Sequence, residues 1–312
     1  MSGVLIGSVL LAVYNRQAII DWARLRNYTP PARVAELADK TTMNDRARRL
    51  FYVNRPELND KETFNQNCTD SEATVVLGCY VSGQGIYVYD VKDKRLTGVH
   101  EVTAAHEMLH VAYERLSNEE RAKIDALTVS TMKTIKDQRI IKTVKQYNDK
   151  DPYIVPNELH SILATEVRKL PAELEIYYQK YFNDRDKVVN LSESYEEAFN
   201  EIEDKVAAYD AELKVLKRQI EALQRTLELE QKQLASSKLS LDTYYEQKKY
   251  DQYNNLVPDY NALVREHNAN VVVIQQKIDR YNTVVKLRNN LATQQNQLYK
   301  AIDSRPEKVK TR

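Results

Sequence analysis

The segment His106-Glu107-Met108-Leu109-His110 contains residue types at a spacing that can do chemistry. On a helix, residues four positions apart project from one face, so His106 and His110 can bind the same metal ion. Glu107 projects about 100 degrees further round, where its carboxylate can take a proton from a metal-bound water. A zinc ion lowers the pKa of such a water to about 7. The segment therefore predicts Zn2+ as the cofactor and Glu107 as the catalytic general base.

The residues around this segment predict the helix that must position it. Thr103 is a candidate N-cap, because a threonine hydroxyl can accept a hydrogen bond from the first turn. Apolar residues then recur at the spacing of one helical face, at Val102, Ala105, Leu109, Ala112 and Leu116.

A catalytic zinc site with two histidines needs a third protein ligand and one open position for water. The candidates lie in residues 156–167, where Pro156 predicts the start of a second helix. This helix carries Glu158, His160 and Glu166. Around it, His160 points about 200 degrees and Glu166 about 80 degrees away from Glu158, so at most one or two of them can face the metal.

Several short motifs between residues 40 and 185 resemble those of uncharacterised bacterial membrane-anchored proteins with a gluzincin-like HExxH metallopeptidase domain. The motifs are Leu50-Phe51-Tyr52-Val53-Asn54, Leu77-Gly78-Cys79-Tyr80, Ile86-Tyr87-Val88-Tyr89, His106-Glu107-Met108-Leu109-His110 and Asn157-Glu158-Leu159-His160-Ser161. The resemblance implies an α+β fold, in which a zincin-like domain with a small sheet is followed by a coiled coil. It also implies hydrolysis of a peptide or protein substrate.

The resemblance favours Glu158 as the third ligand, because Asn157-Glu158 at the start of the second helix is similar to the ligand helix of glutamate-type zincins. The chain departs from that pattern at Ile162, where a further carboxylate is expected. Glu166 therefore stays an alternative, either as a ligand or as the acceptor that orients one of the two histidines. His160 stays an alternative as well, since a fourth protein ligand would make the site structural.

The resemblance also implies a substrate-binding strand before the active helix, whose edge pairs with the extended backbone of the substrate. Residues 85–91 follow a Gly83-Gln84-Gly85 turn and are rich in β-branched and aromatic residues, so they are predicted to form this strand. Hydrolysis needs a further donor to the oxyanion, and the sequence offers His160, Arg168, Tyr177 and Tyr178 as candidates.

The character of the chain changes near residue 187, and glycine is absent from Ser192 onward. Apolar residues then alternate at spacings of three and four, which is typical of a coiled coil. The first ladder is Tyr195, Phe199, Ile202, Val206, Tyr209, Leu213, Leu216, Ile220, Leu223 and Leu227. The second is Tyr253, Val257, Tyr260, Val264, His267, Val271, Ile274, Ile278, Tyr281 and Val285.

The two ladders predict an antiparallel helical hairpin with its turn at Lys248 to Asp251. Pro258 falls near the start of the second helix, where a kink is tolerated. His267 lies in the seam and is interpreted as a core histidine. The hairpin is a candidate surface for a protein partner or for self-association.

Cys68 and Cys79 are the only cysteines, and their spacing is not that of a C-x-x-C motif. We expect them to form a disulfide, which favours a location outside the cytoplasm. The alternative is a pair of reduced, buried thiols. Zinc binding by these cysteines is not expected, because the histidine site already provides enough ligands.

The run from Gly3 to Tyr14 is uncharged and mostly apolar, but it is shorter than the about 18 residues that a membrane span needs. It fits the hydrophobic region of a signal peptide, the end of an anchor that begins upstream, or a buried N-terminal helix. Three arginines that follow the run oppose an outside orientation under the positive-inside rule. We expect a membrane-anchored, extracytoplasmic protein.

The composition, with 46 Lys and Arg against 45 Asp and Glu, does not suggest a nucleic-acid partner, which would require clustered excess positive charge. The expected organisation is a membrane anchor or signal-like segment over 1–22, a linker over 23–39, the metallopeptidase domain over 40–186, the antiparallel coiled coil over 187–304 and a disordered tail over 305–312. The alternative to an enzyme is a non-catalytic envelope scaffold or adaptor that acts through its coiled coil, with a structural or vestigial metal site.

Overall fold

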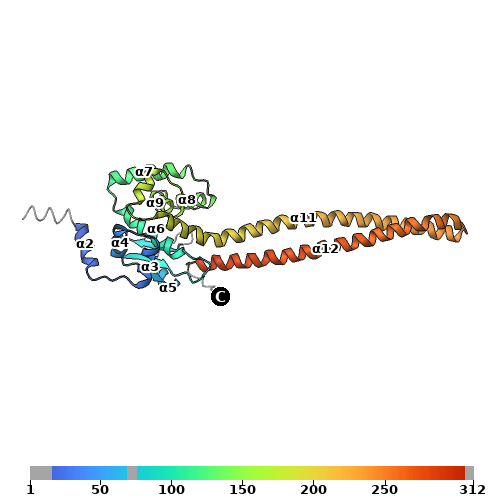
Figure 1. Cartoon of the computed structure of the whole chain (residues 1–312), viewed down its shortest axis with the longest axis horizontal. Helices are drawn as coiled ribbons and strands as arrows, with labels where there is room; N and C mark the ends of the chain where they lie inside the picture. Colours follow the sequence, from blue (N-terminus) through green and yellow to red (C-terminus); the bar gives the residue numbers. More distant parts are fainter. Residues whose placement is uncertain (1–15, 69–75, 306–312) are drawn as a thin grey trace, which may run out of the picture. The chain divides into compact units, whose positions relative to one another are not determined.

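The computed structural model describes residues 16–68 and 76–305, which are mostly helical (Figure 1). By their contacts the described residues divide into two compact units. The first unit extends to Ala198 and includes the residues from Leu298 onward, and the second comprises Phe199–Gln297. The expected boundary at residue 187 therefore lies inside the first unit.

Before the two long helices, the described residues of the first unit form nine helices and three strands. In chain order they are α2 (Arg16–Leu25), α3 (Ala32–Lys40), α4 (Asp45–Val53), β1 (Glu57–Asn59), α5 (Lys61–Asn67), β2 (Gly78–Val81), β3 (Gly85–Tyr89), α6 (Val99–Glu114), α7 (Asn118–Met132), α8 (Gln138–Lys150), α9 (Val155–Glu166) and α10 (Ala172–Tyr178). The long helices are α11 (Arg185–Glu246) and α12 (Tyr250–Ile302).

The strands form one mixed sheet in the order β1-β3-β2. β3 pairs in parallel with β1 and antiparallel with β2, so both of its edges are occupied. The predicted strand at residues 85–91 therefore exists as β3 but cannot offer an edge to a substrate, and that part of the prediction is wrong. Among the described strands, β2 is the edge strand that packs against α6.

Helix α6 runs through the centre of the first unit, with Ala104, Ala105, Met108 and Leu109 fully buried. It begins earlier than expected, at Val99, after Gly98 with a φ of 98°. A Cβ at Gly98 would stand 2.4 Å from the carbonyl oxygen of Leu191, so this tight entry requires glycine.

Two predictions for the N-terminal half of this unit are wrong. Thr103 is not an N-cap, because it lies inside α6 and its hydroxyl donates to the carbonyl of Val99 at 2.7 Å. Residues 23–39 are not a linker, since they contain most of α3, whose Val34 and Leu37 are buried in the core.

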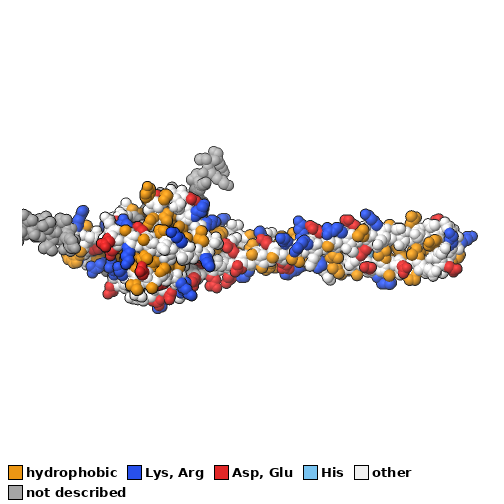
Figure 2. All heavy atoms as spheres, turned by 90° about the horizontal axis from the view of Figure 1, so that it is seen from above, with side chains coloured by type: hydrophobic (Ala, Val, Ile, Leu, Met, Phe, Trp, Pro, Cys, Tyr) orange, Lys and Arg blue, Asp and Glu red, His pale blue; other side chains and the backbone are white. Residues whose placement is uncertain are grey.

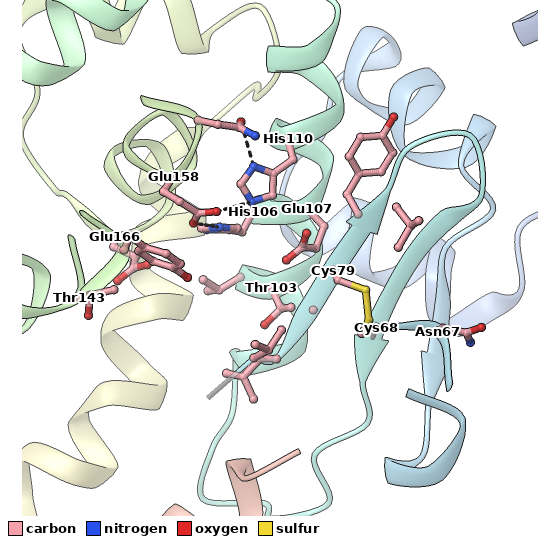
Figure 3. Close-up of a pocket in the computed structure, with 18 of the residues that line it drawn as sticks. Asn67, Cys68, Cys79, Thr103, His106, Glu107, His110, Thr143, Glu158 and Glu166 are labelled. Carbon is pink, nitrogen blue, oxygen red and sulfur yellow. Dashed lines mark hydrogen bonds and ion pairs between the residues drawn. A yellow bond between two sulfur atoms is a disulfide. The ribbon is translucent and has the colours of Figure 1, made fainter. Parts of the chain in front are cut away.

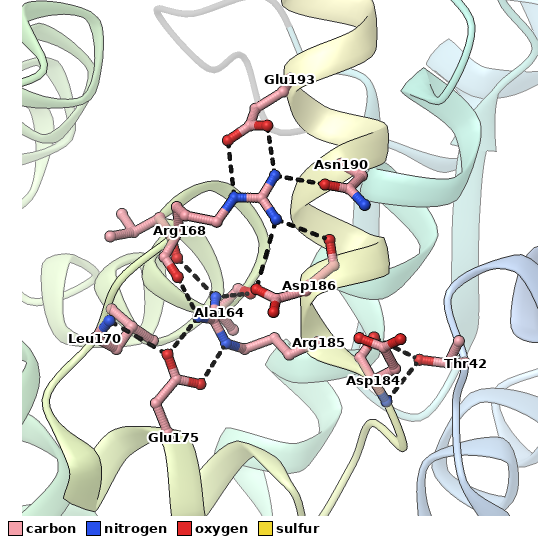
Figure 4. A network of polar contacts seen from close by, with 11 residues as sticks. Thr42, Ala164, Arg168, Leu170, Glu175, Asp184, Arg185, Asp186, Asn190 and Glu193 are labelled. Carbon is pink, nitrogen blue, oxygen red and sulfur yellow. Dashed lines mark hydrogen bonds and ion pairs between the residues drawn. The ribbon is translucent and has the colours of Figure 1, made fainter.

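Arg185, the first residue of α11, ties α9 and α10 to that helix (Figure 4). Its guanidinium is buried and donates to the carbonyls of Ala164 and Val167 at 3.2 and 2.7 Å. The same group forms an ion pair with Glu175. A buried guanidinium is stable only when its donors are satisfied, and these bonds satisfy them. The end of α9 is therefore held firmly.

The second unit consists of most of α11 and most of α12, which pair as an antiparallel hairpin, as predicted. Arg280 pairs with Glu212, and Arg288 pairs with Asp210, so positions late in α12 face positions early in α11. The chain reverses between the two helices at Lys248, which has a φ of 59°. Pro258 lies inside α12, near its start.

The seam of α12 follows the second predicted ladder except at two positions, Val271 and Val285, where the preceding residue lies in the seam. Val271 is 44% exposed, and Val284 rather than Val285 is fully buried. Asn270 occupies the seam beside His267, and both contact the buried carboxylate of Glu230, at 2.6 and 3.1 Å. The polar side chain of Asn270 provides a hydrogen bond to the buried carboxylate of Glu230, whereas Val271, the predicted seam residue, has no donor to offer.

The predicted anchor over 1–22 and the predicted tail over 305–312 lie largely outside the described residues. Within the described part of the chain, no helix has the length and apolar character needed to cross a bilayer.

Candidate metal centre

Helices α6 and α9 bring together His106, His110 and Glu158 (Figure 3). One ligand atom from each lies within 4.8 Å of the others. Nε2 of His106 is 3.5 Å from Oε2 of Glu158, and Nε2 of His110 is 3.7 Å from Oε1. These three residues are the ones that the sequence favoured, and their side chains converge on one point.

The orientation of His110 is set by Asn157, which the sequence analysis did not identify as a site residue. Nδ1 of His110 lies 3.0 Å from Oδ1 of Asn157 and 3.4 Å from the hydroxyl of Ser161. An amide oxygen only accepts, so Nδ1 carries the proton and the lone pair of Nε2 faces Glu158. The signal in the sequence was the Asn-Glu pair at the start of α9.

The electrostatics of the group favour a positive charge at its centre. Burial alone would lower the pKa of His106, but the close contact with the negatively charged Glu158, with smaller contributions from Glu107 and Glu166, raises it to about 9. Burial would likewise raise the pKa of Glu158, but its contacts with the two histidines outweigh burial and lower it. Burial lowers the pKa of His110. A divalent cation fits such surroundings.

The fit to a cation is also visible at Glu158 itself. Its Oε2 is buried, and the contact of this atom with Nε2 of His106, at 3.5 Å, is longer than a good hydrogen bond. Two imidazole nitrogens and a carboxylate oxygen form a donor set that zinc accepts. The residues present therefore fit the metal that the sequence predicts.

Glu107 lies on the same turn of α6 and is 4% exposed. Together with the three candidate ligands it lines a cavity of about 630 Å³. The lining of this cavity includes β2, from Gly78 to Val81, and Arg139 and Tyr147 of α8.

The outer edge of β2 carries main-chain groups that do not bond to β3. The N–H of Tyr89 donates to the carbonyl of Leu77 at 2.8 Å, which makes these two residues a hydrogen-bonded pair. Bonded and non-bonded pairs alternate along an antiparallel ladder, so the main-chain groups of Gly78 and Tyr80 point away from β3.

The alternative ligands lie outside the convergent group. Glu166 forms an ion pair with Arg139 at 2.5 Å, and Arg139 also contacts Glu196 at 2.7 Å. His160 is fully buried behind the site, where its Nε2 lies 2.8 Å from the hydroxyl of Tyr177. Burial lowers the pKa of His160 to about 3.

None of the four expected oxyanion donors lines the cavity. His160 and Tyr177 bond to each other, and the hydroxyl of Tyr178 donates to the carbonyl of His160 at 2.8 Å. Arg168 is bound to Glu193 and Asn190 on α11 (Figure 4). Tyr147 does line the cavity, and its hydroxyl lies near enough to the carboxylate of Glu158 to help lower the pKa of that group. Nothing in the spacing of the sequence distinguished it from the other tyrosines.

Cys68 and Cys79 form a disulfide, as expected. The bond joins the C-terminal end of α5 to β2, and both cysteines line the same cavity (Figure 3). The disulfide therefore fastens the strand that forms one wall of the candidate site.

Comparison with known proteins adds no relative: no family model, no curated protein and no solved structure matches this chain.

Proposed function

We propose that this protein is a zinc-dependent peptidase. The single observation that carries the proposal is the convergence of His106, His110 and Glu158 on one point beside Glu107, in the wall of an open cavity. Three protein ligands leave one coordination position open, which is the arrangement of catalytic rather than structural zinc sites. The resemblance to gluzincin-like proteins points to the same chemistry.

When bound, zinc would supply Lewis acidity, which lowers the pKa of water and polarises a carbonyl group. Glu107 would accept the proton of the attacking water on its carboxylate and pass it to the leaving amine. Asn157 would hold His110 in the tautomer that binds metal. Tyr147, whose hydroxyl already reaches Glu158, would donate a hydrogen bond to the oxygen that gains negative charge.

The outer edge of β2 would bind the substrate. An extended peptide can pair with the main-chain groups of Gly78 and Tyr80, as an additional antiparallel or parallel strand. This binding mode recognises backbone rather than side chains, so it is suited to a peptide or protein substrate.

The decisive experiment is Glu107→Gln. The variant keeps all three ligands, so it should contain as much zinc as the parent, while hydrolysis of a fluorogenic peptide library should fall by about 10²-fold to 10⁴-fold, the range contributed by a general base. Zinc is measured by elemental analysis of the purified protein. A variant as active as the parent on a substrate that the parent cleaves would refute the mechanism.

The second candidate function is a non-catalytic envelope scaffold that acts through the hairpin of α11 and α12. Apolar side chains reach the surface of the hairpin between charged ones (Figure 2), and Leu229 and Leu239 are 62% and 69% exposed. Such residues suit a protein partner or self-association. Parent protein that binds zinc but hydrolyses no member of the library would favour this function.

We further propose that the protein is anchored to a membrane through its N-terminus and faces the outside of the cytoplasm. The disulfide between Cys68 and Cys79 supports the compartment, because disulfides persist mainly in oxidising surroundings. The apolar run before Arg16 supports the anchor.

A further inference from the structure

Helix α2 has its polar and apolar faces reversed. Its buried residue is Asp21, which is 4% exposed, whereas Ile19, Ile20 and Trp22 are 51%, 38% and 63% exposed. Ile19 lies about 160 degrees from Asp21 around the helix, so the apolar side chains point away from the protein. A helix on the surface of a water-soluble domain normally has the opposite arrangement.

Charged groups, rather than apolar packing, fasten α2 to the first unit. Both carboxylate oxygens of Asp21 accept hydrogen bonds from the guanidinium of Arg115, at 2.6 and 3.0 Å. Arg115 directly follows the last residue of α6, the helix that carries the two histidines. Arg24 donates to the carbonyl of Gly83 at 2.7 Å, in the turn between β2 and β3.

The outward face has the chemistry of a lipid interface. Arg16 and Arg26 flank the three apolar residues, and the guanidinium of Arg26 lies 5.5 Å from the ring centre of Trp22. Asp21 is the only acidic residue of α2, and it is turned inward and paired. Tryptophan and arginine beside aliphatic residues are enriched where protein meets phospholipid headgroups.

The sequence before α2 points to the same occupant. The uncharged, mostly apolar run from Gly3 to Tyr14 ends two residues before the helix begins. The run lies outside the described residues, but its composition would bring the start of α2 to a bilayer. The positive charges of Arg16 and Arg26 complement anionic headgroups, whereas a partner protein would have to supply acidic residues to match them.

We propose that α2 lies in the interface of an anionic membrane through Ile19, Ile20 and Trp22, and that the Asp21–Arg115 ion pair fixes the first unit to this helix. The turn at Gly83 is held close to the bilayer as a result, because Arg24 bonds to it. The membrane contact does not depend on the metal site. One consequence rests on the proposed function: β2 would meet peptide segments that lie next to the bilayer.

Trp22 is the only tryptophan of the chain, so its fluorescence reports on α2 alone. The full-length protein is reconstituted with phosphatidylcholine vesicles, with and without phosphatidylglycerol. We expect the emission to shift to shorter wavelength, nitroxide-labelled lipids to quench it, and iodide to lose access, all more strongly with phosphatidylglycerol. Emission typical of water, together with full iodide quenching in vesicle-bound protein, would overturn the proposal and leave the upstream run as the whole anchor.

Variants separate the membrane contact of α2 from the effect of the Asp21–Arg115 ion pair. Replacing Ile19 and Ile20 by serine should weaken quenching of Trp22 by lipid, while the matched change of Val129 and Ile176, which are 42% and 66% exposed on other helices, should not. Equal effects of the two pairs would show that general surface hydrophobicity, and not α2, makes the contact.

The role of the Asp21–Arg115 ion pair is tested with a fluorophore attached to Ser82→Cys, beside Gly83, which reports how close this turn lies to the bilayer. Lipid nitroxides should quench this label in the parent, and Arg115→Gln or Asp21→Asn should abolish that quenching while Trp22 remains quenched. The fixed orientation would be refuted if the label were unquenched in the parent. It would also be refuted if Arg115→Gln and Asp21→Asn left the label as strongly quenched as in the parent. Zinc content and peptidase activity are measured separately, so failure of the proposed function would be recognised independently.

Discussion

Gly78 of β2 lies directly against Glu107 of α6. A Cβ at Gly78 would stand 2.8 Å from Oε1 of Glu107 and 2.9 Å from its Cγ. The same atom would stand 2.5 Å from Cγ2 of Thr103. The strand can approach the helix this closely only because it has no side chain at this position, and the bare backbone confines the carboxylate of Glu107.

Gly78→Ala should therefore displace the carboxylate of Glu107 without touching a metal ligand. We expect zinc content to stay at the parent level and kcat to fall by at least about 10²-fold, because a small misplacement of a catalytic group is costly. Elemental analysis and peptidase assays measure the two effects.

Thr103→Ser supplies the control for this change. Serine keeps the hydroxyl bond to Val99 but removes the methyl group that the new Cβ would meet. In the double variant Gly78→Ala/Thr103→Ser, thermal stability should recover while activity stays low. Recovery of activity would show that general strain, and not the position of Glu107, caused the loss.

Zinc binding should depend on His106, His110 and Glu158. We expect about one zinc per chain in the parent, and each single change to alanine should remove most of it, since a site of two remaining ligands binds weakly. Glu166→Gln is the matched control, because Glu166 pairs with Arg139 instead of joining the ligand group. Retention of zinc in Glu158→Ala together with its loss in Glu166→Gln would reverse our assignment of the third ligand.

Tyr147→Phe should reduce kcat by about 10²-fold to 10³-fold, the usual cost of losing one oxyanion donor. KM and zinc content should change little, because the hydroxyl is needed mainly in the transition state. Tyr177→Phe removes a hydroxyl that is buried behind the site and should leave kcat unchanged. Equal effects of the two changes on kcat would exclude the proposed role of Tyr147.

Glu196 should contribute stability to the first unit that is lost as the pH rises toward neutrality. Burial raises the pKa of this carboxyl from its ordinary value of 4.5 to about 7, although Arg139 opposes the shift. The folded state thus holds a proton that the unfolded state releases, and the stability present below about pH 4.5 is lost as the pH rises through about 7.

Glu196→Gln should remove this part of the pH dependence. Between pH 4.5 and 7 the free energy of unfolding of the parent should fall, relative to that of the variant, by on the order of 2 kcal/mol. Chemical denaturation of the metal-free proteins at a series of pH values gives the difference. Parallel pH profiles for the two proteins would contradict the assignment.

The hairpin offers two valines of α12 for a direct comparison. Val284 is fully buried and Val271 is 44% exposed. Val284→Asp should destabilise the hairpin by at least about 3 kcal/mol, because it buries an unpaired charge, whereas Val271→Asp should change stability by less than about 1 kcal/mol. Thermal melts followed by circular dichroism measure both. A large loss in Val271→Asp would restore the register that the second ladder predicted.

The local sequence pattern was enough to predict the helical hairpin and the position of His106 and His110 on one face of a helix. The spacing of His106 and His110 by one helical turn depends only on neighbouring residues, and so does the alternation of apolar residues along α11. The disulfide was also expected, because two isolated cysteines in a chain have few alternatives. The prediction placed Val271 in the seam of α12 because valine is apolar and has the right spacing. In the structure Asn270 takes that place, because its amide donates a hydrogen bond to the buried carboxylate of Glu230.

The contents of the cavity were decided by tertiary structure. The sequence left Glu158 and Glu166 as candidate ligands and did not distinguish Tyr147 from the other tyrosines. Only the packing of α9 against α6, and of α8 against α9, brought Glu158 to the two histidines and Tyr147 into the cavity lining, and kept Tyr177 out of that lining. The sheet order, which makes β2 rather than β3 the edge strand, follows from pairing between residues distant in sequence. Periodicity along a chain reports which face of an element is buried, but the identity of its neighbour depends on long-range packing, which no local pattern contains.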